Sequence, residues 1–199
     1  MKYTIHQGDN EHVIFHLHGT GGTSTELFSI GQSIDKNATL IGIDGDVFEN
    51  GMRRYFARYE DLSFDLESLD KQTDKLYKTI TEIIEKEMLK GKIMTLLGYS
   101  NGANIAINLL KKYSLNFNHF ILFHPTLVNK GIPFKSQDDL IVLMTYGEND
   151  PFVDENSFKL LKKELSKAKI KVKTFEHKQG HSLTRDEVID ARKLVNKTT

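Results

Sequence analysis

Short apolar runs alternate along the chain with longer stretches in which apolar positions recur every three or four residues. The short runs predict strands and the longer stretches predict helices. Most of the runs are apolar throughout, which is typical of a parallel sheet covered on both faces. The predicted strands are residues 13–18, 39–43, 93–97, 119–123, 140–144 and 170–175, and the last alternates as a sheet edge does.

The clearest helical stretch runs from Leu66 to Met88, with Gly91 as the expected C-terminal cap. Thr184 and Glu187 form a capping-box pattern ahead of the last helix. Further helices are predicted at 103–110, 158–165 and 184–195. The order of elements predicts a doubly wound, mostly parallel α/β sheet in one domain, 1–199. Ligands of such sheets bind beyond the carboxyl ends of the strands.

A G-x-S-x-G motif, Gly98-Tyr99-Ser100-Asn101-Gly102, lies between the third predicted strand and the following helix. This context predicts a sharp turn that lifts the Ser100 hydroxyl clear of the sheet as a nucleophile. Glycine at both flanking positions fits, because so tight a turn leaves almost no room for side chains. An ordinary turn with a serine cap is the alternative.

A serine nucleophile needs a base, and the acid and histidine follow the serine in chain order in this fold. Asp150 follows the fifth predicted strand, and His181 follows the sixth. We expect His181 to act as the base and Asp150 to orient it. The weaker candidates are Asp154 and Glu148 as the acid, and His177 as the base.

The glycine-rich turn at 18–22, HGTGG, follows the first predicted strand and exposes backbone N–H groups. We expect the Thr20 and Asn101 N–H groups to bind the oxyanion of a tetrahedral intermediate. His18 is expected to brace this turn, and His16 to be a core histidine. No third ligand accompanies them, so no metal site is expected. His124, which ends a strand near the predicted site, has no predicted role.

The segment 45–65 leaves the carboxyl end of the second predicted strand and is rich in rings and arginines. It should therefore border the pocket, with apolar side chains against an acyl or aromatic group and an arginine available for a carboxylate or phosphate. The candidate substrate-binding residues are Phe48, Met52, Arg53, Tyr55 and Phe56.

Composition narrows the classes of function. The 199 residues include 27 basic and 27 acidic side chains. The chain therefore lacks the net positive charge that would indicate a nucleic-acid partner. There is no cysteine, which excludes disulfides and thiolate chemistry. No secretion signal and no apolar run of roughly 20 residues is present, which predicts a cytoplasmic protein without a membrane span.

The motifs together resemble the phospholipase/carboxylesterase family of small α/β-hydrolases, over nearly the whole chain from 18–22 to 180–184. The run 98–106, GYSNGANIA, is the most specific part. It and the stretch Arg53 to Phe56 look like a bacterial branch associated with quinone and hydroquinone stress. The resemblance implies an α/β-hydrolase fold and esterase activity on small acyl esters, with Ser100, Asp150 and His181 as the triad.

The main hypothesis is a carboxylic ester hydrolase that works through an acyl-enzyme on a small-molecule ester and needs no cofactor. The spacing of the elements leaves no room for a large cap, so an open site is expected. Thioester or lysophospholipid hydrolysis would use the same residues. A non-catalytic binding protein and a peptidase are rival hypotheses, and the sequence leaves open whether the chain forms a homodimer.

Overall fold

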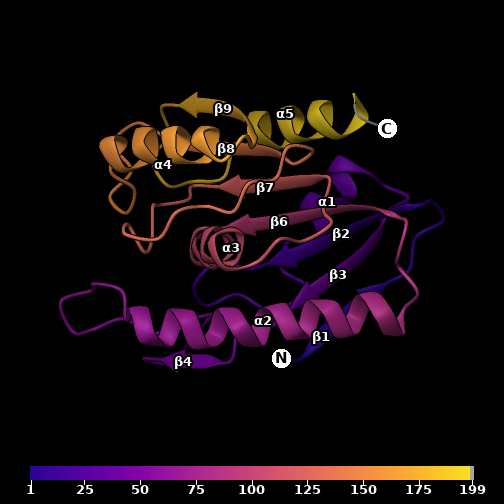
Figure 1. The fold of residues 1–199 in the computed structure, drawn as a ribbon, viewed down its shortest axis with the longest axis horizontal. Coiled ribbons are helices and arrows are strands. Elements are labelled where there is room, and N and C mark those ends of the chain that lie inside the picture. The colour runs from indigo at the N-terminus through magenta and orange to yellow at the C-terminus, as the bar shows by residue number, and fades with distance from the viewer. Residues whose placement is uncertain (198–199) are drawn as a thin grey trace.

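A computed structural model describes residues 1–197, and a seven-stranded sheet in the order β1-β3-β2-β6-β7-β8-β9 runs through its centre (Figure 1). Strand β1 is antiparallel to β3, and the other neighbouring pairs are parallel. The strands of this sheet are β1 (Tyr3–His6), β2 (His12–Leu17), β3 (Thr39–Ile43), β6 (Ile93–Tyr99), β7 (His119–Phe123), β8 (Ile141–Gly147) and β9 (Lys171–His177).

Helices cover both faces of the sheet, as the apolar strands require. The helices are α1 (Phe28–Ile34), α2 (Leu66–Lys86), α3 (Asn101–Lys112), α4 (Glu155–Lys167) and α5 (Arg185–Asn196). Residues of α2, α3 and α4 pack into the larger apolar cluster on one face. Helices α1 and α5 contribute to the smaller cluster on the other face. The predicted doubly wound, mostly parallel sheet is thus confirmed, and no large cap covers it in the part of the chain that is described.

The predicted helix boundaries need one correction. Helix α2 ends at Lys86, and Met88 rather than Gly91 takes the left-handed position after it, with a φ of 54°. Gly91 also has a positive φ, 88°, in the next turn. The capping box of Thr184 and Glu187 at the start of α5 is present as predicted.

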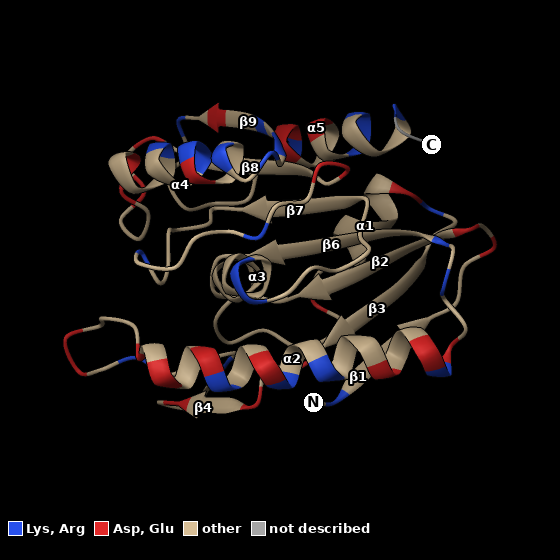
Figure 2. Cartoon of the chain, viewed as in Figure 1, with Lys and Arg blue, Asp and Glu red and all other residues tan. Residues whose placement is uncertain are grey.

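The structure adds β1, α1 and a hairpin of β4 (Val47–Glu49) and β5 (Met52–Arg54) to the predicted elements. These elements are short and have few buried side chains. Only Gly31 and Ile34 are buried in α1, and no side chain caps its first turn. Periodicity over so few positions is too weak to reveal them. Charged residues recur along the length of α2 and α4 (Figure 2).

The turn between β6 and α3 is sharp and closely packed. Ser100 has φ 51° and ψ −110°, which is strained for a residue with a side chain. A Cβ at Gly98 would lie 2.8 Å from the backbone of Gly102 and Ala103. A Cβ at Gly102 would collide with the carbonyl of Leu17 on β2. The two glycines therefore let α3 start directly against the sheet.

Within residues 1–197, none of the helices combines the length and the apolar character needed to cross a bilayer.

We predict that Gly102→Ala lowers the free energy of unfolding by about 1–3 kcal/mol, because the new methyl group must displace the β2 backbone. Gly131→Ala is the matched control, since a Cβ there meets no atom within 4 Å. It should stay within about 0.5 kcal/mol of the parent. Urea denaturation measures both, and equal midpoints for the two variants would contradict the packing argument.

Candidate active site

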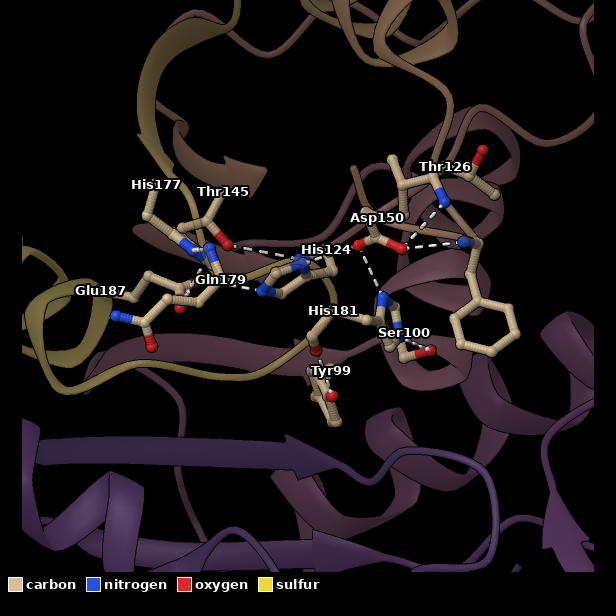
Figure 3. Close-up of polar contacts among 12 residues, drawn as sticks. Tyr99, Ser100, His124, Thr126, Thr145, Asp150, His177, Gln179, His181 and Glu187 are labelled. Atoms are coloured by element: carbon tan, nitrogen blue, oxygen red, sulfur yellow. Dashed lines mark hydrogen bonds and ion pairs between the residues drawn. The ribbon is translucent and has the colours of Figure 1, made fainter. Parts of the chain in front are cut away.

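Ser100 lies at the carboxyl end of β6, where its Oγ is 2.9 Å from the Nε2 atom of His181 (Figure 3). Its backbone N–H donates to the Phe123 carbonyl of β7 at 2.9 Å. This bond anchors the strained turn to the neighbouring strand. Ser100 also precedes α3, whose N-terminal dipole favours negative charge at this end of the sheet.

His181 lies in the loop between β9 and α5, and its ring is held from several sides. Its Nδ1 atom is 2.7 Å from Asp150 Oδ2, and the Tyr99 hydroxyl donates to its carbonyl oxygen at 2.7 Å. The Phe152 ring packs edge-on against it, with ring centres 4.8 Å apart. Because Nδ1 donates to a carboxylate, the neutral ring presents the lone pair of Nε2 to Ser100.

Asp150 follows β8, and its side chain is fully buried. The Oδ1 atom accepts the backbone N–H groups of Phe152 at 2.8 Å and Val153 at 3.2 Å. Burial raises the pKa of this carboxyl, but the hydrogen bonds from His181, Phe152 and His124 outweigh burial and lower it below the usual value. Asp150 is therefore a carboxylate that can orient His181.

Burial is the main influence on the His181 ring and lowers its pKa below 6.5, while Asp150 raises it in part. A lowered pKa leaves Nε2 unprotonated at neutral pH. The ring is thus in the state that can accept a proton from Ser100.

The weaker candidates for the acid and the base lie elsewhere. The Asp154 carboxylate caps α4 by accepting the Ser157 N–H at 2.8 Å. Glu148 is exposed beyond β8. His177 ends β9 and pairs with Glu187. The side-chain contacts of His181 instead join Ser100 on one side of the ring to Asp150 on the other.

The turn that carries Thr20 is held by several polar contacts. His18 Nδ1 donates to the Gly19 carbonyl at 2.6 Å, while its Nε2 accepts the Gly45 N–H at 3.0 Å. Arg54, which is buried, donates from Nη1 to the Thr20 hydroxyl at 2.7 Å. His18 therefore has the bracing contacts expected of it, and Arg54 adds a support that the sequence did not predict.

Asn101 is the first residue of α3, so its N–H belongs to the helix-terminal donors without an intrahelical partner. Its side-chain oxygen accepts the Tyr55 N–H at 2.7 Å. The hydrogen bond joins the start of α3 to the segment after β5. The N–H groups of Thr20 and Asn101 remain the proposed oxyanion donors.

The candidate substrate-binding residues divide by exposure. Tyr55 and Phe56 are fully buried, and the Tyr55 hydroxyl donates to the Ile43 carbonyl at 2.5 Å. Because they are buried, these two side chains cannot contact a substrate directly, and their role is structural instead. Phe48 and Met52 of the β4–β5 hairpin are 64% and 40% exposed, and so can present apolar surface.

Arg53 is already engaged. Its Nη1 donates to the Gly45 carbonyl at 2.9 Å, its Nε lies 3.8 Å from Asp44, and its guanidinium covers the Phe48 ring. The nearby carboxylate offsets its charge, which weakens the case for a substrate anion at Arg53.

His16 is buried in the core beside Phe28, and burial lowers its pKa to about 3. It is thus a neutral core residue. Two residues without a predicted catalytic role lie beside the candidate triad instead. His124 and Glu187 extend the contacts beyond Asp150. The position of His124 at a strand's carboxyl end is the one signal in the sequence that points to it, whereas the pattern around Glu187 indicates only a helix cap.

Comparison with known proteins agrees with this architecture. Residues 4–199 match the phospholipase/carboxylesterase family. A Bacillus subtilis (strain 168) protein named "Putative hydrolase MhqD" is 35% identical over 192 residues, 96% of each chain.

Two solved structures superpose closely. A Bacillus cereus carboxylesterase has a TM-score of 0.95 at 31% identity, over 100% of this chain and 95% of its own. A structure of YahD with malic acid has a TM-score of 0.92 at 33% identity, over 100% and 99%. The predicted resemblance and the α/β-hydrolase fold are confirmed: the chain belongs to the phospholipase/carboxylesterase family of hydrolases.

Proposed function

We propose that this protein is a serine carboxylesterase that cleaves small carboxylic esters through an acyl-enzyme on Ser100. The observation that carries the proposal is the continuous set of contacts from Ser100 Oγ to His181, at 2.9 Å, and from His181 to Asp150, at 2.7 Å. The strained backbone of Ser100 supports it, because strain of this kind is concentrated at functional sites.

In the first half of the reaction, Ser100 Oγ attacks the ester carbonyl carbon while His181 Nε2 takes the hydroxyl proton. Asp150 stabilises the imidazolium that forms. The carbonyl oxygen becomes an oxyanion, for which we assign the N–H groups of Thr20 and Asn101. One such donor is typically worth about 10²–10³ in turnover.

Collapse of the tetrahedral intermediate breaks the bond to the alcohol, which leaves with the proton from His181. Water then attacks the acyl-enzyme, with His181 again taking a proton. The second collapse releases the carboxylic acid and returns the proton to Ser100. The cycle uses water and the ester, and the residues named here move every proton.

The surroundings of the site favour a small or extended ester. Met52 lies against the glycine-rich turn at 18–22, which we call the oxyanion turn, and is 3.8 Å from where a Cβ on Gly21 would be. Phe152 is 66% exposed and packs on His181. These side chains offer apolar contact without enclosing a long chain, so we assign them to the acyl or alcohol group.

Ser100→Ala should reduce turnover of p-nitrophenyl acetate by about 10⁶-fold, to the level left by the remaining groups. A fluorophosphonate probe should label the parent protein at Ser100 and leave this variant unlabelled. Mass spectrometry of the labelled peptide locates the adduct.

Ser166→Ala is the matched control, since Ser166 is exposed on α4 and bonds within its own helix. It should retain parental turnover and labelling. Ester turnover within tenfold of the parent in Ser100→Ala, or a folded parent that resists the probe, would refute the serine mechanism.

Acidification should reduce kcat/KM with a midpoint below pH 6.5. Burial of His181 lowers its pKa, so the ring stays an unprotonated base to a lower pH than a free histidine, and the rate falls once it is protonated. Hydrolysis of p-nitrophenyl acetate between about pH 4.5 and 8.5 measures this, with circular dichroism at each pH to verify folding. A midpoint above 6.5, or a rate independent of pH, is the contrary result.

A further inference from the structure

The contacts of the triad continue beyond Asp150 into the interior (Figure 3). Asp150 Oδ2 is 3.0 Å from His124 Nδ1, and His124 Nε2 is 3.1 Å from Glu187 Oε1. His177 Nε2 in turn is 3.2 Å from Glu187 Oε2. The side chains of Asp150, His124 and Glu187 are fully buried. We call Asp150, His124, Glu187 and His177 the buried charge cluster.

A metal site must be considered first, because two histidines and a carboxylate converge here with ligand atoms within 4.8 Å of one another. The hydrogen bonding argues against it. His177 Nδ1 accepts the Gln179 N–H at 3.0 Å, so it carries no proton. The ring proton is then on Nε2, 3.2 Å from Glu187 Oε2, and this nitrogen has no lone pair for a metal. The cluster is instead a set of hydrogen-bonding and ionic contacts.

The two ring nitrogens of His124 each face a buried carboxylate. A neutral imidazole carries one N–H, so its other nitrogen would direct a lone pair at a carboxylate oxygen about 3 Å away. A doubly protonated ring donates from Nδ1 to Asp150 and holds its positive charge 3.1 Å from Glu187, which gives the two buried acids a shared counter-charge. Burial lowers the pKa of His124, but Glu187 and Asp150 outweigh burial and raise it above 6.5.

The other contacts of the cluster point to the same charge state. Glu187 Oε2 accepts the Thr184 N–H at 2.6 Å and the Thr184 O–H at 2.8 Å. Burial alone would raise the pKa of Glu187, but its polar contacts outweigh burial and lower that pKa. The backbone N–H of His124 donates to the Thr145 hydroxyl oxygen at 3.3 Å. His124 also has a φ of 52°, a strained conformation that the surroundings must hold.

We propose that His124 is an imidazolium ion held between Asp150 and Glu187, and that it is a positioning residue for the catalytic base. It fixes the Asp150 carboxylate toward His181 and sets the pH range in which His181 works. This inference rests on the proposed serine carboxylesterase function. His124 and Glu187 thus extend the contacts of the proposed triad as far as the N-terminal cap of α5.

The effect on His181 follows from charge. Burial lowers the pKa of His181 most, and the charge of His124 lowers it further, against the opposite effect of Asp150 and Glu187. The titratable groups that face His124 come from β6, β8, β9 and α5 and the loops that follow: Tyr99, Asp150, His177, His181 and Glu187. With His124 charged, His181 remains a base at a pH where Asp150 alone would keep it protonated.

The charge state can be tested without any activity measurement. Long-range ¹H–¹⁵N NMR spectra of the histidine rings distinguish an imidazolium from the two neutral tautomers. We expect both nitrogens of His124 to show imidazolium shifts at pH 7, where His181 is neutral. Glu187→Gln, which keeps a capping side chain at this position, should move deprotonation of His124 to a lower pH. Neutral His124 in the parent at pH 7, or an unmoved titration in Glu187→Gln, would overturn the proposal.

The kinetic test uses His124→Asn, because asparagine tolerates the left-handed backbone and carries no charge. Loss of the cation should raise the pKa of His181 by about 1 unit, which lowers kcat/KM about tenfold on the acid limb of the pH profile. At high pH, where His181 is unprotonated in both proteins, kcat/KM should change less. A merely structural role would lower the rate equally at all pH values and leave the midpoint in place, and that result would refute the proposal.

His119→Asn is the matched control. His119 is a buried histidine on the same strand, β7, at the end away from the site, where its Nδ1 contacts Thr95. Its replacement should leave the midpoint unmoved. If Ser100 fails to react with the probe, the proposed function fails while the NMR result still decides the charge of His124. If Ser100 reacts and His124 is neutral, only this inference fails.

Discussion

The geometry of the site depends on the turn in which β6 passes into α3 without room for a side chain on either flank. Backbone atoms of β2 and of α3 occupy the space that a Cβ at Gly102 or Gly98 would need. Ser100, between them, has a positive φ, and it lies at the carboxyl edge of the sheet. The same turn positions Tyr99, whose hydroxyl donates to the carbonyl oxygen of His181. One steric constraint thus places the proposed nucleophile, Ser100, and part of the support of the proposed base, His181.

The second constraint is electrostatic. Two fully buried carboxylates, Asp150 and Glu187, would be costly without compensation. Backbone N–H groups satisfy Asp150 Oδ1, and Thr184 satisfies one side of Glu187. His124 lies between the remaining oxygens. Glu187 also takes part in the capping box of α5, so the end of that helix and the charge near the triad depend on one side chain.

The side of the site that faces a substrate is organised differently. The β4–β5 hairpin holds the oxyanion turn from outside the main sheet, since the Gly21 N–H donates to the Arg53 carbonyl at 2.8 Å and Arg54 contacts Thr20. Buried rings at Tyr55 and Phe56 anchor the hairpin to the core. Its side chains Phe48 and Met52 are exposed and so can present apolar surface beside this turn. One segment thus combines buried residues that hold this turn with exposed apolar residues beside it.

The sequence by itself determined the features that depend on neighbouring residues or on strand order. Long apolar strands, the G-x-S-x-G turn and the capping box are local patterns, and parallel order placed Ser100, Asp150 and His181 at one edge. The tertiary structure decided the rest. His124 meets Asp150 across 26 positions of sequence, and the inward orientation of Tyr55 depends on where the hairpin packs. Burial and the pairing of charges are properties of the packed molecule, because they arise only when distant segments exclude water together. For that reason local pattern was enough to propose Ser100 as the nucleophile, whereas only packing showed what surrounds Asp150, the proposed acid.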